Sequence, residues 1–407
     1  MEGLVIGLDL NDDYSQVSCN EKEKSWTVPT VICRRKEKET WLIGEEAYAA
    51  TLLGEGVIVD KLLKMVRKDG TSTIGGICYT GMDLLKIFLK KLLEYPFKEF
   101  HTDEVAQLVI TMHKTDARVT DCLMYCADHL NIPRDRVHVI SHTESFAYYV
   151  LSQRKELWSN QVGLFELSED RLCYYEMKVQ RGMRRNMVQA EAQNQEEAFD
   201  LDILNSPSGS KLADQILCSC GEKLLEKKLF STVFLTGKGF ERQDWATGFM
   251  KLACNRRRVF VENVLFSKGA AVKAGDYLAQ GTEFPYVFVC EGRLKAEVAL
   301  KVMRAGKEIL LAVASYGDNW YESKSSLELI LDDQKEIGFI ISHLDSRKKR
   351  IVSVPLSGFP ERPRRTTRIQ MNIGFTDENT MAVVIRDKGF GELFPASDTV
   401  IRQEVIL

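Results

Sequence analysis

The chain has 407 residues, of which 44% are hydrophobic and 28% are charged, and these proportions are typical of a soluble globular protein with two or three domains. Its net charge of -3, from 55 basic and 58 acidic side chains, argues against a general binder of nucleic acids or membrane surfaces. Because the sequence has neither a membrane-length apolar run nor a signal-peptide pattern, its 10 scattered cysteines are expected to be reduced, and we predict a cytoplasmic protein.

The first predicted element is a β-hairpin over residues 4–17. Its first strand is apolar except for Asp9, and a buried strand tolerates a carboxylate only when that group has a partner or a function. The sequence Asn11, Asp12, Asp13 predicts a tight turn, because Asn and Asp side chains bond to their own backbone. An extended apolar segment at residues 25–31 completes a predicted β-meander.

Helices and strands follow the meander. Apolar residues at helical spacing predict helices at residues 82–95 and 114–130. Buried strands are predicted at residues 105–112 and 137–140, and a further helix is expected to open at His142 with Glu144 in its first turn.

The next part of the chain is expected to repeat the first. A strand at residues 161–167 carries Glu166 where the first strand has Asp9, and a return strand follows at residues 172–179. Residues 181–212 are polar, and part of them is predicted to be loop. The remaining predicted elements are a helix at 212–229, a strand at 232–236, a glycine turn at 237–239, a helix at 264–271 and a linker at 275–285.

Beyond the linker the pattern changes to short strands, several of them with alternating apolar and polar residues. Turn signals such as Gly306 and the sequence Asp377-Glu378-Asn379 separate these strands, which predicts an all-β sandwich. The predicted strands are at residues 301–313, 325–331, 336–343, 351–354, 368–375 and 380–386.

These segments together resemble the actin and heat-shock-chaperone ATPase superfamily, and most closely the seventy-kilodalton heat-shock chaperones. The similar segments are the opening hairpin, residues 25–31, a helix start at 42–47, a helix at 57–68, the segments 142–149, 237–239 and 264–271, and the stretches 355–364, 369–375 and 380–387. Each match is short, but all occur in the family's order.

The resemblance implies a two-lobed α/β actin-like (ribonuclease H-like) ATPase fold followed by a β-sandwich like the chaperones' peptide-binding domain. The expected domains are residues 1–157 for the first lobe, 158–281 for a reduced second lobe and 282–407 for the sandwich. The chaperones continue into a helical lid, whereas the similarity ends at Leu407, so we expect a lidless relative.

The resemblance also implies the residues that would contact a nucleotide, if one binds. They are Asp9, Lys61, Glu144, Glu166, Gly237 and Gly239. Lys61 corresponds to the family's phosphate-contacting lysine, and the alternative is an ordinary solvated residue. The insertion that helps to clamp adenine in the chaperones is shorter here.

The two turns that grip phosphates in the family differ in this chain. Glycine-rich turns supply backbone N–H groups to phosphates, but Asn11-Asp12-Asp13 and Ser168-Glu169-Asp170-Arg171 present paired acids. A carboxylate about 4 Å from a phosphate oxygen is repelled by several kcal/mol at an intermediate dielectric. We therefore predict a degenerate nucleotide cleft with no catalytic residues, no metal and no resident cofactor.

Two alternatives remain open. The protein could be a working chaperone ATPase that binds ATP and Mg²⁺ at a rewired site. The carboxylates could also hold a divalent metal that recruits phosphate; that set is Asp9, Asp12, Asp13, Glu166, Glu169 and Asp170. His138 and His142 have no third ligand nearby in the sequence, and Cys122 and Cys126 are expected to pack in a core.

The favoured function is a non-catalytic, chaperone-like binding or scaffolding protein. We expect its sandwich to bind a peptide segment or a protein partner along a rim at residues 305–317 and 323–329. We expect no binding to nucleic acids or membranes, and the sequence predicts no particular oligomeric state. Arg362, Arg364, Arg365, Arg368 and residues 347–350 form a basic cluster, which is either a solvated sheet edge or a site for an acidic partner.

Overall fold

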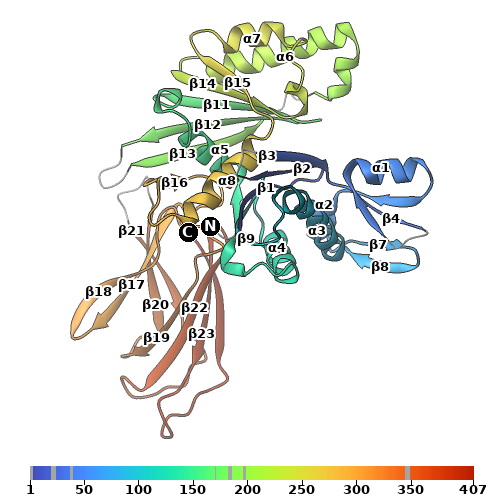
Figure 1. Cartoon of the computed structure of the whole chain (residues 1–407). Helices are drawn as coiled ribbons and strands as arrows, with labels where there is room; N and C mark the ends of the chain where they lie inside the picture. Colours follow the sequence, from blue (N-terminus) through green and yellow to red (C-terminus); the bar gives the residue numbers. More distant parts are fainter. Residues whose placement is uncertain are drawn as a thin grey trace. The chain divides into compact units, whose positions relative to one another are not determined.

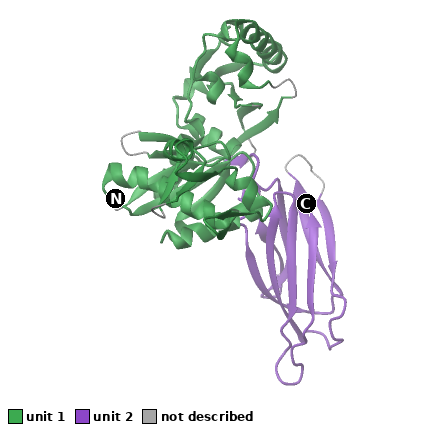
Figure 2. Ribbon diagram, turned by 90° about the vertical axis from the view of Figure 1, so that its right-hand side faces the viewer, with its two compact units in different colours: residues 1–286 green, residues 287–407 purple. Residues whose placement is uncertain are grey.

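The computed structural model describes residues 3–19, 24–36, 40–169, 171–181, 186–195, 199–343 and 349–407. The chain divides into two compact units, unit 1 at Met1–Tyr286 and unit 2 at Val287–Leu407 (Figure 2). Within the described ranges, no helix has both the length and the apolar character needed to cross a membrane.

Sheet 1 of unit 1 has the strand order β10-β9-β1-β2-β3, of which Figure 1 labels β9, β1, β2 and β3. Strand β1 is antiparallel to β2, which is antiparallel to β3, whereas β9 runs parallel to both β1 and β10. The predicted opening meander is therefore confirmed. The strand bounds are β1 Leu4–Asp9, β2 Tyr14–Cys19, β3 Lys24–Pro29, β9 Val105–Met112 and β10 Val137–Ser141.

Within unit 1, sheet 2 repeats this arrangement with the strand order β15-β14-β11-β12-β13. Strands β11, β12 and β13 form an antiparallel meander, and β14 is parallel to β11 and β15. Asp9 pairs with Thr111 in sheet 1, and Glu166 pairs with Thr236 at the equivalent place in sheet 2. The expected internal repetition is thus confirmed for strand order. The bounds are β11 Gln161–Leu167, β12 Leu172–Gln180, β13 Met187–Asn194, β14 Phe230–Thr236 and β15 Arg258–Val261.

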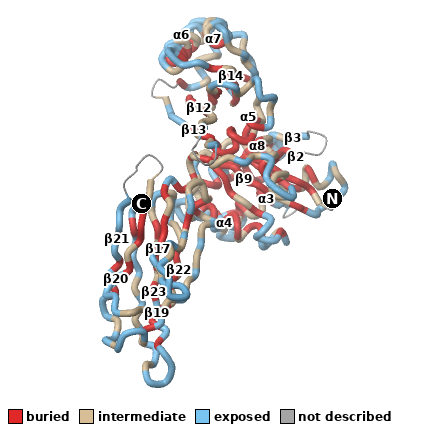
Figure 3. The backbone as a smooth tube through the Cα atoms, turned by 90° about the vertical axis from the view of Figure 1, so that its left-hand side faces the viewer, coloured by how far each residue is buried: buried red, intermediate tan, exposed pale blue. Residues whose placement is uncertain are grey.

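Two helices, α5 at His142–Leu151 and α8 at Leu265–Leu278, pack beside sheet 1, and Figure 3 shows this region as mostly buried. The close approach of α8 requires glycine at two contacts. A Cβ atom on Gly7 of β1 would lie 2.1 Å from the carbonyl oxygen of Ser267, and one on Gly269 would lie 2.0 Å from that of Ser145. These glycines let α8 touch the backbones of both β1 and α5.

The other elements of unit 1 complete its two halves. The longer helices are α1 Gly44–Leu52, α2 Leu62–Arg67, α3 Gly81–Phe100, α4 Ala117–His129, α6 Pro207–Leu225 and α7 Thr247–Ala253. A small sheet β5-β4-β6 and a hairpin β7-β8 have the bounds β4 Ile32–Arg35, β5 Trp41–Ile43, β6 Gly56–Val59, β7 Thr71–Ile74 and β8 Ile77–Thr80. Short 3-10 helices are at Arg134–Arg136, Lys155–Leu157, Leu201–Asn205 and Lys238–Phe240.

The helix predicted over residues 57–68 is wrong in its first half. Residues 57–59 belong to strand β6, in agreement with the β-branched side chains there, and the helix α2 starts only at Leu62. Lys61 separates the two elements because its backbone is left-handed, with φ of 52°.

Two other helix boundaries differ from the prediction because capping residues were not recognised. Helix α4 begins at Ala117, after Asp116 accepts a hydrogen bond from the backbone N–H of Val119. Helix α6 begins at Pro207, after Ser206 accepts one from Gly209, in a stretch predicted to be loop. Strand β13 also lies in that stretch, and α8 extends to Leu278, into the predicted linker.

Unit 2 contains two four-stranded antiparallel sheets, in the orders β18-β17-β20-β21 and β19-β22-β23-β24. One face of the second sheet is apolar, because alternate residues such as Met371 and Ile385, which pair with each other, are fully buried. The bounds are β16 Val287–Val289, β17 Ala296–Arg304, β18 Lys307–Ala314, β19 Ser325–Leu331, β20 Glu336–His343, β21 Lys349–Pro355, β22 Thr367–Asp377, β23 Thr380–Asp387 and β24 Val400–Ile406.

Candidate functional site

Unit 1 contains a cleft of about 910 Å³ at the ends of the two central hairpins. Its lining includes both hairpin turns, the start of α2 and the segments that follow β9 and β14. Of the residues implied by the family resemblance, four line the cleft: Asp9, Lys61, Glu166 and Gly237. Glu144 is buried in the first turn of α5, and Gly239 is buried behind the glycine turn, and neither belongs to the described lining.

The first hairpin turn is tied to the start of α2 by its own carboxylates. The side-chain oxygen of Asn11 accepts hydrogen bonds from two backbone N–H groups inside the turn. Asp12 accepts hydrogen bonds from the backbone N–H groups of Leu63 at 2.8 Å and Lys64 at 3.3 Å. Asp13 forms an ion pair with Lys61, and this hydrogen bond is the main reason that the pKa of Lys61 lies above its ordinary value. The backbone N–H groups at the start of α2 and the ammonium group of Lys61 therefore already have carboxylate partners within the chain.

The second hairpin turn has a corresponding ion pair. Glu169 accepts a hydrogen bond from Lys238 of the glycine turn at 2.6 Å, which raises the pKa of Lys238. The Lys238 ammonium also lies 5.6 Å from the ring centre of Tyr14, a residue of sheet 1. Lys238 thus connects the second turn to the first hairpin. Asp170 lies outside the described residues.

The glycines of the turn 237–239 are required by packing. Gly237 has φ of 94°, and a Cβ atom there would lie 2.5 Å from the carbonyl oxygen of Leu167. A Cβ atom on Gly239 would lie 2.4 Å from a side-chain carbon of the same residue. The end of β11 therefore explains both glycines without a nucleotide.

At the floor of the cleft, Asp9 has the partner that its burial requires. The Nε2–H group of His142 donates to Asp9 Oδ1 at 2.8 Å, and the two side chains are 2% and 5% exposed. The His142 ring is stacked on Phe266 of α8 with ring centres 3.9 Å apart. This contact and the hydrogen bond together fix the orientation of the imidazole.

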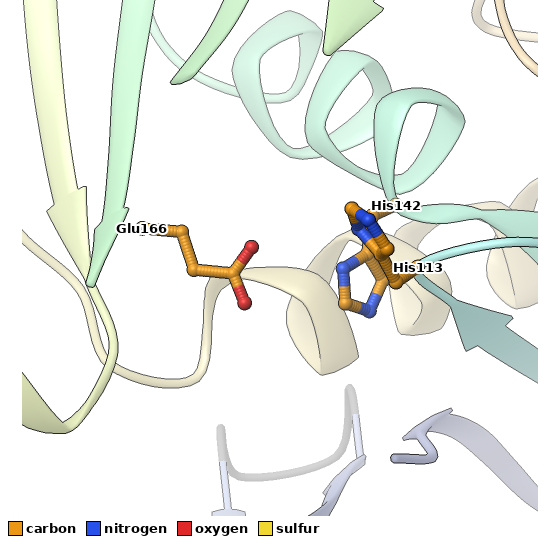
Figure 4. Close-up of side chains that lie close together, drawn as sticks. All are labelled: His113, His142 and Glu166. Carbon is orange, nitrogen blue, oxygen red and sulfur yellow. The ribbon is translucent and has the colours of Figure 1, made fainter. Parts of the chain in front are cut away.

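Four side chains, which we call the floor cluster, meet beside this pair: His113, His142, Glu166 and Tyr175 (Figure 4 draws His113, His142 and Glu166). The hydroxyl of Tyr175 donates to Glu166 Oε2 at 2.7 Å. Its oxygen lies 3.3 Å from Nδ1 of His113 and 3.4 Å from Nδ1 of His142. The histidines come from the residues just after β9 and β10, and the other two residues come from sheet 2, so the cluster joins the two sheets.

Burial and neighbouring charges set the ionisation of the floor cluster. Burial, together with the positive charge of Arg171, lowers the pKa of His113 to about 4, so this imidazole is neutral at pH 7. Burial, the largest single effect, raises the pKa of Glu166, but Arg171, which donates to it at 3.0 Å, the two histidines and the Tyr175 hydroxyl together outweigh it, so the net pKa is lowered. Burial beside Glu166 raises the pKa of Tyr175 well above its ordinary value. The cluster therefore contains a carboxylate, a neutral imidazole and a protonated phenol.

His113 and Tyr175 were not predicted as site residues, and His142 was considered only with His138. In the structure His138 lies elsewhere, stacked on Tyr277 with ring centres 3.8 Å apart. A signal did exist, because His113 and His142 directly follow neighbouring parallel strands, whose last residues Met112 and Ser141 are in register. Carboxyl ends of parallel strands are common positions for site residues.

Three arginines of the predicted basic cluster of unit 2 have acidic partners within the chain. Arg362 forms a bidentate pair with Asp387, while the exposed Arg364 and Arg365 pair with Asp333 and Asp332. Residues 347 and 348 lie outside the described residues. The positive charges of these three arginines are therefore balanced within the chain, whereas the described part of the chain shows no ion pair for Lys349, Arg350 or Arg368.

Two family models together match nearly the whole chain. The model described as "Family of unknown function (DUF5716) C-terminal" matches residues 13–291, and the model described as "Domain of unknown function (DUF8552)" matches residues 293–407. The division between the two matches falls close to the division between unit 1 and unit 2. No curated protein matches the chain.

Proposed function

The chain belongs to the DUF5716 family, and we propose that it is a non-catalytic binding or scaffolding protein whose unit 1 is an actin-like fold with a nucleotide cleft that its own ion pairs occupy. The observation that carries this proposal is the set of carboxylates at the two hairpin turns, Asp12, Asp13 and Glu169, which line the cleft and two of which pair with its lysines. The duplicated order of the sheet strands supports the actin-like fold, because both central hairpins end at the cleft.

The ion pairs by themselves are weak obstacles to a phosphate. The side chains of Lys61 and Asp13 are 50% and 41% exposed, and pairs of this kind contribute about 0–1 kcal/mol. Breaking such a pair would therefore reduce the free energy of nucleotide binding only slightly.

The carboxylates that remain are the stronger obstacle. A phosphate charge placed about 4 Å from one carboxylate is repelled by about 4 kcal/mol at an effective dielectric constant near 20. Asp12, Asp13 and Glu169 all line the cleft, and Asp12 already accepts the N–H groups at the start of α2. The repulsion from these three carboxylates exceeds the attraction that Lys61 and Lys238 would provide after release from their ion pairs. We therefore expect Mg·ATP to bind weakly or not at all.

Calorimetric titration of the full chain with Mg·ATP tests this proposal. The wild-type chain is expected to show no saturable binding up to about 1 mM nucleotide. The double variant Asp13→Asn/Glu169→Gln frees both lysines and should bind polyphosphate at least tenfold more tightly than a control variant, Glu94→Gln, whose carboxylate pairs with Lys91 and Lys98 of α3. Micromolar binding of Mg·ATP by the wild-type chain would contradict the proposal and favour a working ATPase.

We further propose that unit 2 is a chaperone-like β-sandwich that binds an extended peptide along an edge strand. The expected rim at residues 305–317 and 323–329 falls on β18 and β19, which are terminal strands in the described order of their sheets. Both strands carry exposed apolar side chains, with Leu310 54% exposed and Ile330 56% exposed. An extended segment can add to such an edge through backbone hydrogen bonds and alternate side-chain contacts.

A peptide array probed with the full chain tests this second proposal, with substitutions on opposite edges of one sheet. Leu310→Lys on β18 should remove most of the array signal, because a charge replaces the apolar contact. Ile351→Lys on β21, where the side chain is 66% exposed, should leave the signal unchanged. An array with no signal above background, or equal losses in the two variants, would refute binding at β18.

A further inference from the structure

We propose that the floor cluster binds one divalent transition-metal ion, of the zinc or cobalt class, and that this ion joins sheet 1 to sheet 2. Its ligands are Nδ1 of the two histidines, Oε2 of Glu166 and Oη of Tyr175. The site is separate from the acidic hairpin turns, and it does not depend on the proposed absence of nucleotide binding.

The first argument is the type and spacing of the donor atoms. Imidazole nitrogen and carboxylate oxygen are common zinc ligands, with bonds of about 2.0–2.2 Å, which place tetrahedral ligand atoms about 3.3 Å apart. Tyr175 Oη lies 3.3 Å, 3.4 Å and 2.7 Å from the other three donor atoms. One donor atom from each of His113, His142 and Glu166 lies within 4.8 Å of the other two, so a shift on the order of 1 Å completes a tetrahedron.

The second argument comes from counting protons around the Tyr175 oxygen. Asp9 Oδ1 accepts the hydrogen on Nε2 of His142, so a neutral His142 carries a bare lone pair on Nδ1. The Tyr175 hydroxyl donates its one proton to Glu166 and cannot also donate to that nitrogen. The Nδ1 atom belongs to a side chain that is 2% exposed, and it faces the Tyr175 oxygen at 3.4 Å, so the two atoms are placed to share one cation. A metal cation is a suitable partner for this lone pair.

The third argument is that the outer groups of a metal site are already present. A ligating histidine in a metal site usually donates its other ring N–H to a carboxylate, as His142 does to Asp9. Glu166 is oriented by Arg171, and the His142 ring is held by stacking on Phe266. His113 and Glu166 also line the cleft, which gives an ion a path from solvent.

Metal binding changes the protonation of the Tyr175 hydroxyl. Burial beside Glu166 keeps the Tyr175 phenol protonated before an ion binds. A phenol oxygen binds a metal ion as the phenolate, so its proton is lost to the solvent when the ion binds. Metal binding should therefore release about one proton per ion.

The test uses the full chain, stripped with a chelator and then titrated with Zn²⁺ alone or Co²⁺ alone. We expect one ion per chain, visible bands of tetrahedral cobalt, and release of about one proton when calorimetry is repeated in buffers of different ionisation enthalpy. His113→Ala and Glu166→Gln should each weaken binding at least tenfold, and Asp9→Asn should weaken it roughly 10–100-fold. The matched control is His129→Ala, an exposed histidine of α4, which should bind like the wild type.

A wild-type chain that takes up no stoichiometric ion would overturn the proposal. So would a His113→Ala variant that binds as tightly as His129→Ala. Because a buried substitution can disturb folding, X-ray absorption of the zinc-loaded wild-type chain provides an independent measurement. Two imidazole nitrogens bound to the zinc ion would support the site, and a zinc ion without a histidine ligand would refute it.

Discussion

Replacing Arg362 by methionine is expected to destabilise unit 2 by about 3 kcal/mol, because the change breaks a buried ion pair and leaves Asp387 without its counter-ion. The guanidinium donates hydrogen bonds of 2.8 Å and 2.7 Å to the two carboxylate oxygens, and the side chains are 5% and 0% exposed. Breaking such pairs typically costs about 3–5 kcal/mol. The backbone N–H groups of Gly389 and Ser397 still donate to the carboxylate, which places the expected cost at the lower end.

Native-state hydrogen exchange on the full chain measures this effect within unit 2. The amides of β22 and β23 around Met371 and Ile385 are the appropriate probes, because both side chains are fully buried. A loss of about 3 kcal/mol corresponds to roughly 100-fold faster exchange through opening of the unit. The control is Arg364→Met, which breaks a pair that is 73% and 66% exposed and should cost at most about 1 kcal/mol. Equal exchange rates in the two variants would refute the reasoning.

Three further predictions concern the titration of Asp387, the close glycine contact of β1 and the independence of unit 2. Burial raises the pKa of Asp387, but Arg362 and the two backbone donors hold the net pKa below the ordinary value. The contribution of this carboxylate to the free energy of unfolding is therefore complete above about pH 4 and is lost as the pH falls further. Urea unfolding of unit 2 at a series of pH values should show this loss, and the variant Asp387→Asn should show a smaller pH dependence. Gly7→Ala should destabilise unit 1 by about 3 kcal/mol in thermal unfolding, because the new methyl group meets the backbone of α8. The control is Gly163→Ala, where the nearest contact of the new methyl group is an ordinary 3.4 Å and the cost should be less than about 1 kcal/mol. Similar losses of stability in the two variants would contradict the close-packing argument. A fragment of residues 282–407 should unfold cooperatively and show a β-type circular dichroism spectrum, and a disordered spectrum would count against an independent unit.

The parts of the fold that the sequence predicted well depend on local patterns. The apolar run of β1, the alternating residues of β22 and β23 and the helical spacing of α3 are strong local patterns, and each element is present. The single strand predicted at residues 301–313 is wrong, because a turn at residues 305–306 divides this stretch between β17 and β18. The buried Asp9 was expected to have a partner, and His142 provides it from a residue 133 positions away. The identity of that partner required the parallel pairing of β9 with β1 and β10, which a single sequence does not specify.

Other features were missed for definite physical reasons. Lys61 was placed inside a helix, but its left-handed backbone and its ion pair with Asp13 place it between β6 and α2. The helix predicted from residue 212 starts earlier, at Pro207, because the capping Ser206 followed by proline marks a helix start that was not recognised in the polar stretch 181–212. Strand β24 was not predicted because its residues are mostly exposed and its pairing with β23 depends on the tertiary structure. The floor cluster was missed because its four members come from two sheets.

The most direct test of the central claim is a crystal structure of the chain grown with millimolar Mg·ATP. The claim is that the carboxylates of the two hairpin turns already bind the lysines and backbone N–H groups that phosphates would need. We predict that Lys61 remains on Asp13, that Lys238 remains on Glu169, and that the cleft between the turns contains no nucleotide. A triphosphate bound between the turns, with either lysine turned away from its carboxylate and onto a phosphate, would contradict the account.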